Sequence, residues 1–126
     1  MKSKNLLRRG IPLLGLILLQ ACTWENLEEL YPESFNCDTS SASYSNDVVP
    51  ILVNNCYACH SKLNAPSFGG GLSLEDHQEV AADTARIIGA IKHMDGFFPM
   101  PRDAGKLDPC PIELIESWAR AGAPDN

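Results

Sequence analysis

The stretch Cys56-Tyr57-Ala58-Cys59-His60 decides how this sequence is interpreted. Two cysteines stand three positions apart, nearly one helical turn, and a histidine directly follows the second. Cysteine pairs of this spacing occur in redox-active disulfides, in zinc sites and at haem attachment sites. The residues elsewhere in the chain distinguish these possibilities.

The surroundings of the motif favour haem attachment. A thioredoxin-like dithiol is expected to follow a strand within a βαβ pattern, and no strand pattern precedes Cys56. A zinc site needs a second close pair of cysteines or histidines, whereas Cys37 and Cys110 are isolated. Haem c needs only the motif itself, because each thiol adds to a vinyl group and His60 reaches the iron from the same face.

Apolar spacing predicts short helices on both sides of the motif and no strand. Ser45-Asn46-Asp47 offers N-cap chemistry for a helix that leads into Cys56, and Pro50 would fall in its first turn if Asp47 is the cap. Glycines and prolines predict an irregular loop over residues 94–107. Further helices are expected over about 74–82, about 84–93 and 108–122. The predicted fold class is therefore all-α.

The first residues have the order of a secretory signal. Basic residues precede an apolar run from Ile11 to Leu19, whose nine residues are too few for a bilayer, which needs about 20. The run ends in Leu19-Gln20-Ala21-Cys22, which resembles the lipobox of bacterial lipoproteins. The resemblance implies that residues 1–21 are removed and that Cys22 carries a lipid anchor. The alternative is an ordinary signal peptide with a cysteine nearby by chance.

Removal of residues 1–21 leaves a strongly acidic chain. Six basic and sixteen acidic residues remain, which gives a formal charge of −10. Such a surface repels nucleic acid and favours a redox partner with a basic docking face. Residues 22–44 show no sustained period and are expected to form the lipidated N-terminus and an acidic tether, followed by one domain over residues 45–126.

Five cysteines suit an exported protein better than a cytoplasmic one. With Cys22 as the lipid site and the motif cysteines as haem sites, Cys37 and Cys110 remain. We expect a disulfide between them, which stabilises the fold by about 4 kcal/mol in the chain-entropy model, and by less where haem already restricts the unfolded chain. The competing hypothesis is that these two cysteines join Cys56 and Cys59 around zinc.

From about Tyr44 to Pro124 the sequence resembles monohaem cytochromes c of class I, in the compact form common among bacterial lipoproteins. The resemblance rests on the haem motif after a first helix, on Met100-Pro101, and on a last helix that carries Trp118. It implies a helical domain around one covalent haem, with Met100 as the second axial ligand and Met94 as its rival. A thioether ligand stabilises ferrous iron and raises the reduction potential.

Two further ligand questions remain at this point. His77 and His93 offer a bis-histidine alternative, although histidines on the helices of a small domain are expected to face solvent. The second ring nitrogen of His60 needs a hydrogen-bond acceptor that fixes the ring, and the carbonyl of Pro66 is the candidate. The aromatic side chains expected to pack around the macrocycle are Tyr57, Phe97, Phe98 and Trp118.

These features predict an electron carrier rather than an enzyme, because no acid, base and nucleophile cluster is apparent. The carrier is expected outside the cytoplasm, on a bacterial membrane, with the outer membrane favoured by Thr23 after Cys22. Two alternatives stay open: a haem peroxidase-like enzyme with an open iron site, and a haem-based sensor or assembly module.

Overall fold

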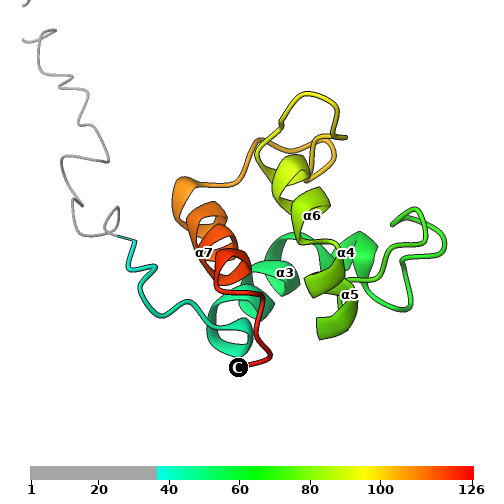
Figure 1. Cartoon of the computed structure of the whole chain (residues 1–126). Helices are drawn as coiled ribbons and strands as arrows, with labels where there is room; N and C mark the ends of the chain where they lie inside the picture. The colour runs from blue at the N-terminus through cyan, green and yellow to red at the C-terminus, as the bar shows by residue number, and fades with distance from the viewer. Residues whose placement is uncertain (1–36) are drawn as a thin grey trace, which may run out of the picture. The chain divides into compact units, whose positions relative to one another are not determined.

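The computed structural model of the protein describes residues 37–126. The expected signal peptide, the lipid site Cys22 and the tether as far as residue 36 lie outside the described residues. Within residues 37–126 the chain forms one π-helix and five α-helices and no strand, which confirms the all-α class (Figure 1). The helices are η3 (Tyr44–Val48), α3 (Val49–Asn55), α4 (Tyr57–His60), α5 (His77–Ala82), α6 (Thr84–Ile91) and α7 (Pro109–Arg120).

The first helix begins earlier than the sequence indicates. Ser43 is the N-cap, and its hydroxyl accepts a hydrogen bond from the amide of Asn46 at 3.1 Å. The carboxylate of Asp47 accepts a hydrogen bond from the amide of Ser43 at 2.8 Å. The two side chains therefore provide acceptors for two amides of the first turn that have no partner within the helix. The prediction that the N-cap lies within Ser45-Asn46-Asp47 is therefore wrong. The amide of Val48 donates to the carbonyl of Ser43, which closes a π turn that holds one residue more than an α turn. Ser43 and Asp47 therefore stand one position farther apart than the usual pair of capping residues.

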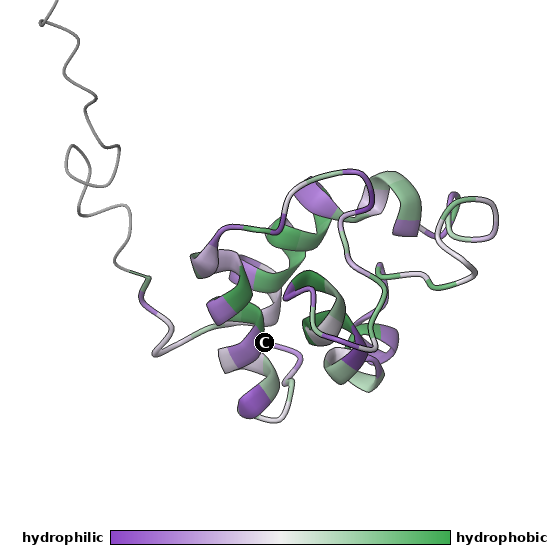
Figure 2. Cartoon of the chain, turned by 90° about the horizontal axis from the view of Figure 1, so that it is seen from above, coloured by the Kyte–Doolittle hydropathy of each residue, from purple (hydrophilic) through white to green (hydrophobic). Residues whose placement is uncertain are grey.

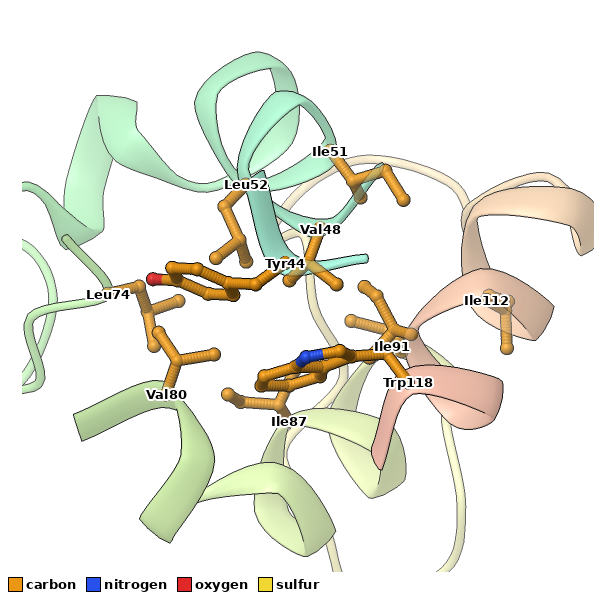
Figure 3. Packing of buried hydrophobic residues seen from close by; sticks show 11 residues of the cluster. Tyr44, Val48, Ile51, Leu52, Leu74, Val80, Ile87, Ile91, Ile112 and Trp118 are labelled. Carbon is orange, nitrogen blue, oxygen red and sulfur yellow. The ribbon is translucent and has the colours of Figure 1, made fainter. Parts of the chain in front are cut away.

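The core lies where α7 packs against η3 and α6 (Figure 3). Trp118 is 0% exposed, and its indole stacks on the ring of Tyr44 with 5.4 Å between the ring centroids. The short helices are amphipathic, as the alternation of hydropathy along them shows (Figure 2). The core cluster contains Tyr44, Val48, Ile51, Leu52, Leu74, Val80, Ile87, Ile91, Ile112, Ile115 and Trp118.

His77 packs against the rings of Tyr44 and Trp118 at the edge of this core, and it does not face solvent as expected. It is half-buried, and its ring meets the edge of the Tyr44 ring at a centroid distance of 4.7 Å. The hydroxyl of Tyr44 points toward Leu74 and has no hydrogen-bond partner among the described residues (Figure 3). Burial raises the pKa of this hydroxyl to about 12, so Tyr44 acts here as a neutral core residue.

The residues after α7 return to the first helix and form a segment that we call the terminal clasp, residues 123–126 (Figure 1). Asn126 accepts hydrogen bonds from the amides of Tyr44 and Ser45, each at 2.8 Å. Trp118 Nε1 donates to the carbonyl of Pro124 at 2.8 Å, and His77 Nε2 donates to that of Ala123 at 2.9 Å. The clasp therefore joins the first helix, α5 and α7.

Cys37 and Cys110 lie at disulfide distance, with their sulfur atoms 2.04 Å apart and their Cα atoms 5.3 Å apart. A second contact follows close by, because the hydroxyl of Ser117 donates to the carbonyl of Thr39 at 2.9 Å. The segment before η3 is thus held along α7. None of the helices between residues 37 and 126 has the length and apolar character that crossing a bilayer requires.

Candidate functional site

The cysteine-histidine motif lies at a break between two helices. Cys56 departs from helical geometry, with φ of −124° and ψ of −38°, and α4 follows it directly. The amide of Cys56 donates to the carbonyl of Leu52 at 2.8 Å, and its own carbonyl accepts from the amide of His60 at 2.8 Å. Both cysteines and the histidine are therefore presented by a single turn that is fixed to the end of α3.

The two cysteines of the motif have free thiols in different surroundings. Cys59 is exposed, whereas Cys56 is partly buried beside the core. Burial raises the pKa of the Cys56 thiol to about 11. Both thiols are available for covalent bonds, and because Cys37 is already paired with Cys110, the four-cysteine zinc site is not formed.

In the chain without haem, iodoacetamide is expected to label Cys59 well before Cys56. The thiolate is the reacting species, and burial keeps the thiolate population of Cys56 low at neutral pH. Timed alkylation followed by peptide mass spectrometry measures the two rates separately. In urea the rates should converge, and equal rates in the folded chain would contradict the burial of Cys56.

The loop that follows α4 fixes the imidazole of His60. Its Nδ1 donates to the carbonyl of Leu72 at 2.9 Å, and the carbonyl of His60 accepts from the amide of Leu74 at 2.8 Å. A carbonyl only accepts, so the proton lies on Nδ1 and Nε2 keeps the lone pair that can bind a metal. The prediction of Pro66 as the acceptor is wrong. Pro66 is exposed, and the carbonyl that accepts from Nδ1 of His60 comes from Leu72, later in the same loop.

The loop after α6 holds Met100 by its backbone. The amide of Met100 donates to the carbonyl of Ala90 at 3.0 Å, and its carbonyl accepts from Nε2 of His93 at 3.1 Å. Met100 is partly buried, whereas Met94 is 48% exposed. His93 is exposed, and its Nε2 donates to the carbonyl of Met100. Nε2 of His77 is likewise engaged, because it donates to the carbonyl of Ala123 in the terminal clasp.

A glycine lets this loop pack closely on α6. Gly89 is buried, and a Cβ added there would come within 2.5 to 2.6 Å of three carbons of the Phe97 ring. The ring therefore lies directly on the backbone of α6. This contact, together with the hydrogen bonds of Met100, sets the path of the loop.

Gly89→Ala is expected to displace Phe97 and to lower the free energy of unfolding by about 1–3 kcal/mol, because a methyl group would overpack the contact. Urea unfolding followed by circular dichroism measures the loss. In a Phe97→Ala background, Gly89→Ala should cost much less free energy of unfolding than it does in the wild type, since the two substitutions act on one contact. Gly105→Ala is the matched control, because a Cβ at Gly105 meets no atom within 4 Å. Additive losses in the Gly89 and Phe97 double variant would contradict this packing.

Large apolar side chains are exposed in the segments that flank the motif and Met100. The most exposed are Leu63 at 87%, Phe68 at 72% and Phe98 at 61%. Arg102 covers part of Phe98, with its guanidinium carbon 4.7 Å from the ring centroid. The full set is Val53, Leu63, Phe68, Met94, Phe97 and Phe98.

Trp118, one of the aromatic side chains expected to pack around the macrocycle, is fully buried. Its ring is enclosed by Tyr44, His77 and the helix core. Tyr57 is partly buried against the core, and burial raises the pKa of its hydroxyl.

Between residues 37 and 126, no three histidine, cysteine or acidic side chains gather as a metal site.

Comparison with known proteins gave no match to a protein-family model, a curated protein or a solved structure.

Proposed function

We propose that this protein is a single-electron carrier that holds one haem c through Cys56, Cys59 and His60, with Met100 as the second axial ligand. One observation supports this most strongly. A single turn presents two free thiols and an imidazole whose Nδ1 is hydrogen-bonded and whose Nε2 lone pair is available. These are the donors that covalent haem attachment and proximal ligation require.

The chain's own residues supply the surroundings that such a group needs. Haem iron contributes a reversible one-electron step between its ferrous and ferric states. The carbonyl of Leu72 orients the imidazole of His60 and makes it a stronger donor. The exposed apolar side chains of the two loops, Phe68 and Phe98 among them, provide a cover that excludes water from the macrocycle.

The proposal includes the location and the partner. Residues 1–21 are proposed as a lipoprotein signal peptide and Cys22 as the lipidated first residue of the mature protein, which the lipobox-like sequence supports. The domain then works outside the cytoplasm on a bacterial membrane. Its acidic surface suits a redox partner with a basic docking face, because opposite charges speed encounter.

The experiment is expression of the full chain in a host with haem-attachment machinery. The mature protein should gain the mass of one porphyrin that survives acid and denaturant, and it should show Soret absorbance. Cys56→Ala and Cys59→Ala should each leave only one thioether bond. The matched control is the double variant Cys37→Ser and Cys110→Ser, which should keep the haem. A mature mass without porphyrin and no Soret band would refute the proposal.

The same preparation separates the electron carrier from the two other haem functions. Two filled axial positions predict low-spin spectra in both oxidation states and fast exchange with soluble redox partners. Rapid peroxide turnover would instead identify an open, peroxidase-like iron site. Tight carbon monoxide binding together with slow electron exchange would identify a sensor or assembly module.

A further inference from the structure

Gly69 lies directly against the imidazole of His60. It is buried, and a Cβ built on it would be 3.0 Å from Nδ1 of His60 and 2.7 Å from the carbonyl oxygen of Cys59. The same Cβ would be 3.0 Å from the Cα of Ala65. Two of these three neighbours are backbone atoms, which cannot turn aside as a flexible side chain can. Only a hydrogen atom fits at this position.

The two glycines that follow are required for a different reason. Gly70 and Gly71 have φ of 62° and 81°, the left-handed region that favours glycine, and a Cβ on either would meet no atom within 4 Å. Gly69 has no positive φ, so its constraint is space rather than backbone conformation. Three consecutive glycines thus perform two separate tasks.

The position of Gly69 also sets where the loop returns to His60. The amides of Gly69 and Gly71 both donate to the carbonyl of Ala65, at 3.0 and 2.9 Å. The next residue, Leu72, supplies the carbonyl that accepts from Nδ1 of His60 at 2.9 Å. Moving the loop outward at Gly69 would therefore move the acceptor of the imidazole proton as well.

We propose that Gly69 is a positioning residue for His60: its missing side chain lets the loop close on the ring, so that the Leu72 carbonyl holds Nδ1 and directs Nε2 outward. This role of Gly69 extends the proposed function and rests on it in one respect only, the identity of the group that Nε2 of His60 binds. A side chain at residue 69 would push the ring and its acceptor apart. Loss of this hydrogen bond makes the imidazole a weaker donor, which favours ferrous over ferric iron.

The test compares Gly69→Ala with Gly70→Ala and Gly105→Ala in the full chain. In haem-free protein at alkaline pH, histidine ¹⁵N spectra report which ring nitrogen of His60 carries the proton. We expect the Nδ1–H form in the wild type and in both control variants, and a loss of this preference in Gly69→Ala. In haem-loaded protein, Gly69→Ala should shift the reduction potential upward. Gly70→Ala should lose stability through its strained φ while the signals of His60 and the potential stay unchanged.

Several results would overturn the inference. One is a wild-type His60 protonated on Nε2, and another is a Gly69→Ala protein whose tautomer and potential match the wild type. General unfolding of Gly69→Ala, with both controls folded, also counts against it, because that is the behaviour of a glycine needed only for folding. A wild type that binds no haem but keeps the expected tautomer pattern would defeat the proposed function and leave the role of Gly69 intact.

Discussion

Replacing Met100 with alanine is expected to lower the reduction potential of the haem-loaded protein by at least about 0.1 V, within the range of about 0.8 V that axial ligands span. A thioether stabilises ferrous iron, so its removal favours the ferric state. Under the proposed function Met100 is the ligand, and its backbone is held on both sides by Ala90 and His93. Redox titration followed in the visible spectrum measures the change.

Met94→Ala is the matched control for this prediction. It removes the same side chain from the same loop at a position that is 48% exposed, and we expect it to leave the potential unchanged. The long-wavelength band of methionine-ligated ferric haem should disappear in the Met100 variant alone. The reverse pattern, with the effect at Met94, would make Met94 the ligand, and no effect at either position would exclude methionine ligation.

Trp118→Ala is expected to lower the free energy of unfolding by about 3–5 kcal/mol, the usual cost of removing a buried aromatic ring. Trp118 is fully buried, stacks on Tyr44, and donates from Nε1 to the terminal clasp. Native proteins are stable by only about 5–15 kcal/mol, so this loss is a large share of the total. Urea unfolding of wild type and variant, followed by circular dichroism, measures the difference.

Trp118→Phe separates the two contributions of the indole. It keeps an aromatic ring on Tyr44 but removes the hydrogen bond to the carbonyl of Pro124, and it should therefore cost less than alanine. A loss of less than about 1 kcal/mol in Trp118→Ala would mean that the core does not depend on this ring.

The sequence predicts the helices well where local signals are strong. Asp108-Pro109 marks the start of α7, and the apolar spacing over 84–93 matches α6 closely. The start of the first helix could not be placed, because the rules for capping assume α-helical turns and this helix opens with a π turn at Ser43. The hydrogen bonds that Asn126 accepts from Tyr44 and Ser45 at this helix could not be predicted either, because they join residues far apart in the sequence.

The candidate site divides in the same way. The motif residues Cys56, Cys59 and His60 can be recognised in the sequence, because their spacing alone places two thiols and an imidazole on one turn. The acceptor for His60 is not, because any backbone carbonyl is chemically equal and only the path of the loop selects Leu72 over Pro66. In the sequence, the tight contacts of Gly69 and Gly89 are marked only by the glycines themselves. The structure is needed to show that neither glycine is required by a positive φ and that space is the reason for it.

The terminal clasp has a consequence for the order of assembly during biogenesis. Tyr44 and its acceptor Asn126 are 82 positions apart, so the first helix gains this support only after ribosomal synthesis has passed residue 126. Until then the nascent polypeptide carries Cys56 and Cys59 downstream of a first helix that lacks its final contacts. Under the proposed function, a haem-attachment enzyme that works on extended or loosely folded chains would act on the motif before these closing contacts make the turn rigid.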